Sequence, residues 1–186
     1  MDGRFFMKNG KCYARVSTIL EKFSDWKGDA KANVARANKA LLGTAVHHAI
    51  DERLSGRDFD LNERESKYFY SYKLWEKMFE PNFLEHEERY FDDDLMITGA
   101  IDGVFVATGY ERPTIVDYKT SVTPSKTWPM QAHFYWLMAS KKWPNINRFV
   151  VFCQLTEGNH PKVHTYNIQD NMINKCILAA KEFWEI

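Results

Sequence analysis

Asp117 and Lys119 lie two residues apart in the apolar run IVDYKT of residues 115–120. Side chains alternate along a β-strand, so this spacing places both groups on one face. A carboxylate can hold a divalent cation, and a neighbouring lysine can orient or deprotonate an attacking water. Asp102 is a lone charge in the apolar run 96–106, and a buried carboxylate needs either a partner or a metal. If these two strands pair, their carboxylates converge on one ion, for which Mg²⁺ or Mn²⁺ is suited.

Each of these features also has a plainer interpretation. Asp117 and Lys119 would make a surface ion pair if their strand lay at the edge of a sheet. Asp102 would be a turn residue beside Gly103. The two features occurring together, and two further motifs, favour the chemical interpretation.

The first further motif is GTAVHHAID at residues 43–51. On a helix, Gly43, His47 and Asp51 fall on one face at four-residue spacing, and Gly43 lets another backbone come close. His47 can then reach the metal, with Asp51 as a partner behind it. A lone helical histidine is more often a core or surface residue, which is our expectation for His48.

The second motif is QAHFY at residues 131–135. Gln131 and Tyr135 lie four residues apart on one helical face. Such a polar pair is suited to holding a phosphate or a catalytic side chain, although a helical tyrosine is usually a core residue.

Taken in order, GxxxH at 43–47, GxxD at 99–102, DYK at 117–119 and QxxxY at 131–135 resemble the PD-(D/E)XK nuclease superfamily, in its RecB-like branch. Residues 10–20, GKCYARVSTIL, resemble a short segment of the mitochondrial genome maintenance exonuclease group and its phage relatives. In those proteins the segment precedes a basic helix and the GxxxH motif. The resemblance covers about residues 10–140.

The resemblance implies a role for each matching position. Asp102 and Asp117 would be metal ligands, His47 would be a further ligand, and Lys119 would position the nucleophilic water. Gln131 and Tyr135 would support the site and contact the DNA backbone.

A glutamate at the start of the first strand is sometimes part of the site in this family. Glu87 and Glu88 are both candidates, strand alternation allows only one to face inward, and we favour Glu88. No proline precedes Asp102, although one is common in this branch. The four cysteines that hold an iron–sulfur cluster in some relatives are absent, so we expect no cluster and interpret Cys12, Cys153 and Cys176 as reduced thiols.

The resemblance therefore implies a Mg²⁺- or Mn²⁺-dependent DNA exonuclease acting on single-stranded DNA or DNA ends, in replication, recombination or repair. An endonuclease of the same fold and a non-catalytic nucleic-acid-binding module remain alternatives. A replication or recombination protein is a candidate partner. We expect the basic side chains of the N-terminal part to contact phosphates: Arg15, Lys31, Arg36 and Lys39. Aromatic side chains are candidates for stacking on unpaired bases: Trp26, Trp128 and Tyr135.

The net charge is zero, but its distribution along the chain is uneven. Residues 1–48 carry nine Lys and Arg against four Asp and Glu, and residues 112–186 carry nine against five. Residues 49–111 carry seven against sixteen. An acidic middle between basic flanks is expected if carboxylates gather around a cation while the flanks meet phosphates. The alternative is that these charges are solvated surface.

The elements that must position these residues follow from hydrophobic periodicity and turn signals. A hairpin turning at Asn9-Gly10 is expected first, then a short helix from Ser17 or Thr18 to Phe23. Helices are expected at about 30–41, 44–54, 63–79, 126–142 and 170–185, and strands at 83–91, 96–106, 114–119, 147–155 and 162–168.

This order predicts an α/β fold with a central mixed β-sheet flanked by helices, and the resemblance implies a restriction-endonuclease-like core. We expect one domain over 1–186, with a mainly helical DNA-binding part at 1–80 and a sheet core carrying the catalytic motif at 81–186. No run approaches the roughly 18 apolar residues that span a bilayer. We expect a protein without a membrane segment, in the cytoplasm of a bacterial or phage-infected cell.

Overall fold

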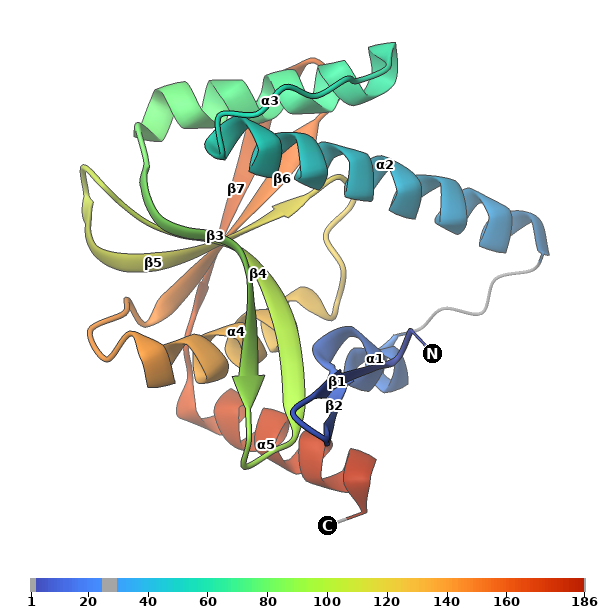
Figure 1. Ribbon diagram of the computed structural model, residues 1–186, viewed down its shortest axis with the longest axis vertical. Coiled ribbons are helices and arrows are strands. Elements are labelled where there is room, and N and C mark those ends of the chain that lie inside the picture. The colour runs from blue at the N-terminus through green and yellow to red at the C-terminus, as the bar shows by residue number, and fades with distance from the viewer. Residues whose placement is uncertain (1–2, 25–29, 186) are drawn as a thin grey trace.

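The computed structural model describes residues 3–24 and 30–185, and the side chains of 30–33, 35 and 36 are not described. Seven strands and five α-helices follow one another in these residues (Figure 1). Their bounds are β1 (Phe5–Lys8), β2 (Lys11–Arg15), α1 (Val16–Leu20), α2 (Ala30–Leu54), α3 (Glu63–Phe79), β3 (Asn82–Asp92), β4 (Ile97–Ala107), β5 (Tyr110–Lys119), α4 (Trp128–Lys142), β6 (Phe149–Thr156), β7 (Asn159–Asn167) and α5 (Asp170–Trp184). A single 3₁₀ turn, Glu21–Phe23, extends α1.

The strands form one mixed sheet in the order β1-β2-β4-β5-β6-β7, and β3 pairs with β4 outside this path. The β2–β4 and β5–β6 pairs are parallel, and the others are antiparallel. One edge of β4 is occupied by β3 along most of its length. The other edge is shared, with β2 at its beginning and β5 at its end. The predicted mixed sheet is therefore confirmed.

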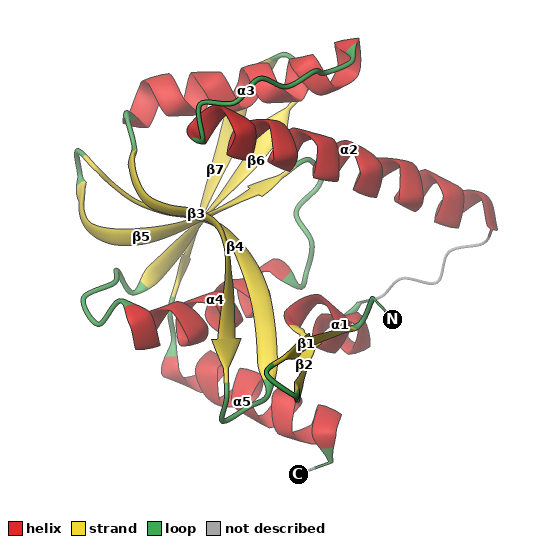
Figure 2. Ribbon diagram, viewed as in Figure 1, coloured by secondary structure: helices red, strands yellow, loops and turns green. Residues whose placement is uncertain are grey.

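Helices cover both faces of the sheet (Figures 1 and 2). α2 and α3 lie together on one face, and α4 and α5 lie together on the other. Each pair encloses its own apolar core. Trp75, Tyr72 and Tyr118 fill the α2–α3 side, whereas Phe134, Phe152 and Met138 are buried on the α4–α5 side. The strands are buried from both faces, which explains why β6 is a nearly continuous apolar run.

Local signals in the sequence set several element ends. Asn9 and Gly10 both take positive φ, 50° and 76°, as a two-residue hairpin turn with matched strand twist requires. The predicted hairpin is therefore confirmed. At the start of α3, Asn62 accepts from the Glu65 amide, and the Glu65 side chain accepts from the Asn62 amide. This reciprocal capping box explains why the predicted and observed beginning of the helix agree.

Two helix predictions were wrong. The segments expected as separate helices at 30–41 and 44–54 form the single helix α2, which runs through Gly43. A mid-helix glycine weakens a helix by about 1 kcal/mol relative to alanine, and this does not end a helix whose far end packs against α3 and the sheet. In α1 the N-cap is Arg15, so Ser17 and Thr18 lie inside the helix, and Thr18 donates its hydroxyl to the Arg4 carbonyl.

Candidate active site

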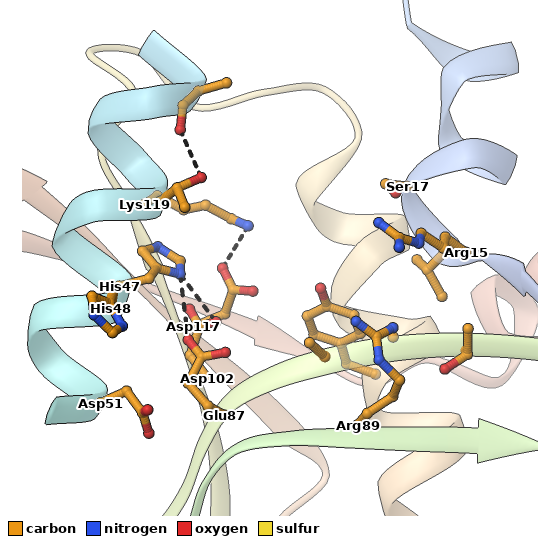
Figure 3. Close-up of a pocket in the computed structure, with 17 residues that line it drawn as sticks. Arg15, Ser17, His47, His48, Asp51, Glu87, Arg89, Asp102, Asp117 and Lys119 are labelled. Atoms are coloured by element: carbon orange, nitrogen blue, oxygen red, sulfur yellow. Dashed lines mark hydrogen bonds and ion pairs between the residues drawn. The ribbon is translucent and has the colours of Figure 1, made fainter. Parts of the chain in front are cut away.

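The shared edge of β4 contains a gap between its two neighbours. Arg15 of β2 pairs opposite Thr98, and the next partner on this edge is Val116 of β5, opposite Gly103. Within the described residues, no strand pairs with 99–102 on this edge. A cavity of about 920 Å³ lies over this gap, and α2 and α4 both contribute to its wall (Figure 3).

Asp102 lies where β4 and β5 stop pairing. Its Oδ2 accepts a hydrogen bond of 2.6 Å from the backbone amide of Tyr118. Its Oδ1 lies 3.3 Å from Nδ1 of His47 on α2. With only 7% of its surface exposed, this carboxylate is buried yet fully partnered, as the sequence argument required.

Asp117 and Lys119 project into the same cavity from the end of β5. Lys119 Nζ lies 2.5 Å from Asp117 Oδ2, and both side chains are largely buried. This burial rules out the plainer interpretation of a surface ion pair. Continuing the β4–β5 register by one step would place Asp117 opposite Asp102, so the two carboxylates stand on the same face where the strands separate.

His47 reaches the site because α2 passes very close to the end of β5. A Cβ added at Gly43 would lie 3.2 Å from the Thr120 hydroxyl oxygen, a tight contact that the Thr120 side chain would have to relieve. Asp51, one turn further on, lines the cavity but does not support His47. Instead Asp51 Oδ1 lies 2.7 Å from Nδ1 of His86.

The glutamate that faces the site is Glu87, so our preference for Glu88 was wrong. The β3–β4 register places His86 opposite Gly103 and Glu88 opposite Ile101, which sets Glu87 across from Asp102 on the cavity face. Ile101 points into the α4–α5 core side of the sheet, and Glu88, which lies opposite it, does not line the cavity. Glu87 also has a positive φ of 48°, which no sequence pattern indicated.

His47, Glu87 and Asp102 each present one ligand atom within 4.8 Å of the other two. Burial raises the pKa of Glu87, the Asp102 charge adds to this, and the result is a pKa of about 7. Burial likewise raises the pKa of Asp117 to about 6, against the opposing effect of Lys119. Burial lowers the pKa of His47, but the neighbouring Asp102 outweighs it and raises that pKa to about 9. The carboxylates thus repel one another enough to favour an additional cation.

Tyr135 of α4 closes the floor of the cavity over Gly99. A Cβ at Gly99 would lie 2.9 Å from the Tyr135 ring, so glycine is what lets the ring lie on β4. Gln131, one turn earlier, donates from Nε2 to the Tyr135 hydroxyl at 2.8 Å. Tyr135 lines the cavity, and Gln131 holds it in place from behind.

The other residues that we predicted to contact DNA differ in where they lie. Arg15 lines the cavity, and Lys39 is exposed on α2. The side chains of Lys31 and Arg36 lie outside the described residues, as does Trp26. Trp128 is 4% exposed and packs against Phe152, so it is a core residue and does not stack on bases.

Sequence reasoning missed two cavity residues with charged or ionisable side chains, Arg89 and His48. Arg89 follows Glu87 by two positions, so strand alternation would have placed both on one face once Glu87 was chosen. His48 lines the cavity with a largely exposed side chain 3.7 Å from Glu52. It was expected to be an ordinary surface residue, and nothing in its spacing distinguished it.

A mixed sheet with an acidic cluster and one lysine where two strands separate defines a nuclease-like α/β protein. The chain matches the model of the PD-(D/E)XK nuclease superfamily over residues 16–178. It belongs to this superfamily, and it is a nuclease.

Solved structures with a similar fold include a candidate exonuclease from Eubacterium rectale, with a TM-score of 0.44 and 10% identity over 90% of this chain and 70% of that one. A phage-related exonuclease from Haemophilus somnus 129PT gives a TM-score of 0.42 and 13% identity over 93% of each chain. No curated protein sequence matches the chain significantly. Both structural likenesses are low. None of the helices within the described residues has the length and apolar character to cross a membrane.

Proposed function

We propose that the protein is a metal-dependent deoxyribonuclease that hydrolyses phosphodiester bonds as an exonuclease, on single-stranded DNA or DNA ends. The observation that carries this proposal is the meeting of Asp102, Asp117 and Lys119 in one cavity, although they come from two strands that separate there. The exonuclease assignment rests on the ordered motifs and on residues 10–20, which resemble the exonuclease group described above.

The donor set fits a divalent cation. His47, Glu87 and Asp102 have ligand atoms close enough together to share one ion, and Asp117 stands beside them. Carboxylate oxygens with one imidazole suit Mg²⁺ or, better, Mn²⁺. When bound, such an ion would supply Lewis-acid stabilisation of the negative charge that develops on the phosphate oxygens.

The side chains of this protein then have separate tasks. Asp102 Oδ2 is fixed by the Tyr118 amide, so Oδ1, beside His47, faces the cavity in one orientation. Lys119, held by Asp117, positions the water whose oxygen forms the new bond to phosphorus. The bond from phosphorus to the leaving 3′-oxygen breaks, that oxygen takes up a proton, and the water gives up one to solvent.

The surroundings of the acidic cluster support a nucleic-acid substrate. Tyr135 and Arg15 line the cavity beside the carboxylates, and Lys39 is exposed on α2. Cationic side chains near phosphates give binding that falls steeply with salt. We place the enzyme in DNA replication, recombination or repair in the cytoplasm of a bacterial or phage-infected cell, where a protein partner would direct it.

A cleavage assay on labelled single-stranded DNA tests the proposal, with Mg²⁺ or Mn²⁺ titrated in and EDTA as control. Lys119→Ala should abolish cleavage while DNA binding persists, and the matched control Lys162→Ala, at an exposed position of β7, should cut normally. Normal cleavage by Lys119→Ala would show that its assigned role is wrong. Failure of the wild-type protein to cut with either metal would favour a non-catalytic binding module.

Substrate form decides the finer points of the proposal. Circular single-stranded DNA should stay intact while a linear DNA of the same sequence is degraded from an end. Cleavage of the circle would identify an endonuclease instead. A linear RNA of the same sequence tests the preference for DNA.

A further inference from the structure

Two arginines line the cavity on the side away from His47 (Figure 3). Arg15 comes from the end of β2 and pairs opposite Thr98, and Arg89 comes from β3 and pairs opposite Ala100. Thr98 and Ala100 line the same cavity as Asp102, and alternation puts all three on one face of β4. The arginines therefore stand on either side of β4, on the face that carries the acidic cluster.

Neither arginine has an ion-pair partner in the part of the chain that the structure describes. Arg15 Nε is buried and makes no hydrogen bond with those residues. The Arg89 guanidinium lies 4.6 Å from the centre of the Phe6 ring, a cation–π contact that does not neutralise its charge. Two half-buried cations that line one cavity, and that make no ion pair within the described residues, favour binding of an anion.

The position of the two arginines indicates which anion they bind. Ala100 and Thr98 precede Asp102 by two and four residues, about 7–13 Å along a strand. An anion between the arginines therefore lies beside the acidic cluster and is not the group that reacts there. A guanidinium presents a planar fork of donors that matches phosphate oxygens. A neighbouring phosphate of the bound strand meets each of these requirements.

We propose that Arg15 and Arg89 jointly bind one phosphate group of the nucleic-acid strand, next to the phosphate that is cleaved. This inference rests on the proposed function for the identity of the ligand. The pair thereby fixes how far the strand advances into the cavity. An internal phosphodiester and a terminal phosphate share the chemistry that the pair recognises, and the experiment below separates them.

The test measures binding in EDTA, so that no cleavage occurs, to four single-stranded DNAs of one sequence. One has free hydroxyl ends, one a 5′-phosphate, one a 3′-phosphate, and one is circular. The variants are Arg15→Gln, Arg89→Gln and the double variant. Arg112→Gln is the matched control, because Arg112 is exposed near the beginning of β5, far along that strand from Lys119.

Each single variant should raise Kd about tenfold, the loss expected for one charge-assisted hydrogen-bonding group. Because both arginines hold the same phosphate, the double variant should lose less than the product of the single losses. The slope of log K against log salt should fall by about 0.7 in the double variant, the value for one phosphate on a single strand. A fall of this slope by about 1.4 would mean that the two arginines bind two separate phosphates, and it would overturn joint binding.

The pattern over the four DNAs identifies the source of the phosphate. Equal losses on all four support an internal phosphodiester. A wild-type preference for one phosphorylated end that disappears in Arg89→Gln supports a terminal phosphate. Variants that bind all four DNAs like the wild type and Arg112→Gln overturn the proposal.

These outcomes are independent of the proposed hydrolysis. A wild-type protein that cuts DNA, with arginine variants that bind normally, would refute this inference and leave the proposed function intact. A wild-type protein that never cuts would refute the proposed function, while the binding losses would still be measurable. Circular dichroism spectra and thermal unfolding of each variant establish that it folds, and Arg89→Lys keeps the charge if Arg89→Gln does not fold.

Discussion

Where β4 and β5 separate, the Asp102 carboxylate replaces a strand partner for Tyr118: it accepts a hydrogen bond of 2.6 Å from the Tyr118 backbone amide. One oxygen thus stabilises the gap in the sheet, while the other faces His47 and the cavity. Structure and proposed chemistry depend on different atoms of the same side chain.

Substitutions at Asp102 should separate these two roles. Asp102→Asn keeps an oxygen that can accept a hydrogen bond from Tyr118, so in EDTA its free energy of unfolding should stay above that of Asp102→Ala. Asp102→Ala leaves that buried amide without a partner and should lower the free energy of unfolding by about 1–3 kcal/mol. Both variants should lose cleavage. Urea unfolding in EDTA and the cleavage assay measure the two effects, and equal stability of the two variants would contradict the structural role.

Glu87 and Glu88 provide a matched pair of neighbouring substitutions. Glu87→Gln should weaken Mn²⁺ binding about tenfold or more, because Glu87 shares the cavity with Asp102 and His47. In the metal-free protein above about pH 7 it should raise the midpoint of thermal unfolding by about 2–4 °C, because it removes a carboxylate that burial and the Asp102 charge make costly to ionise. Glu88→Gln should do neither. Calorimetric titration measures the Mn²⁺ affinity, and thermal unfolding measures the midpoint. Larger effects of Glu88→Gln than of Glu87→Gln would identify Glu88 as the site residue.

Gly99→Ala tests the contact between β4 and α4. The added Cβ would lie 2.9 Å from the Tyr135 ring and 3.0 Å from the Met138 methyl carbon, so the helix or the ring must shift. We expect the free energy of unfolding to fall by about 1–3 kcal/mol, as for other overpacked cores, and cleavage to slow because Tyr135 lines the cavity. Gly3→Ala is the control, since nothing lies within 4 Å of a Cβ there. A variant with wild-type stability and activity would show that Tyr135 is not fixed by this contact.

His133 makes the stability of the α4–α5 pair dependent on pH. Its Nδ1 lies 2.6 Å from the Pro129 carbonyl, and its Nε2 accepts from the Gln169 amide at 3.0 Å, a pattern that only the neutral ring allows. Burial lowers the pKa of His133 below its usual 6.5. The unfolded chain therefore binds the proton more tightly, and acidification through about pH 6.5 favours unfolding.

Removing the ring should reduce this dependence. Between about pH 7 and about pH 5, the free energy of unfolding of His133→Asn should fall by less than that of the wild type. Exposed His160 gives the control, and His160→Asn should follow the wild-type curve. Urea unfolding at several pH values measures the slopes, and parallel curves for wild type and His133→Asn would refute the assignment.

Much of the fold followed from periodicity and turn chemistry. The bounds of α3 were predicted correctly because a capping box and an amphipathic face agree there. The meeting of Asp102, Asp117 and Lys119 was predictable because alternation fixes which side chains share a face, and only the pairing of the two strands had to be assumed. Their chemical roles and the Arg15 contact stay predictions.

The errors come from tertiary relationships that leave little trace in local sequence. Residues 30–54 were divided into two helices, whereas α2 runs through Gly43, whose contact with the Thr120 side chain comes from a distant part of the sequence. The choice between Glu87 and Glu88 depended on the β3–β4 register, which a positive φ at Glu87 and a bulge near Leu84 make irregular. Arg89 was missed for the same reason, since its face depends on that register.

The gap beside β4 has a consequence for when activity can appear during synthesis of the chain. Its two flanking strands, β2 and β5, come from opposite sides of β4 in the sequence, and His47 approaches from a third segment. Such contacts between distant segments cannot form until all of those segments have been made. A growing chain that ends before Lys119 lacks the assembled pocket, so nucleic acid near the ribosome meets an inert polypeptide until synthesis is well advanced.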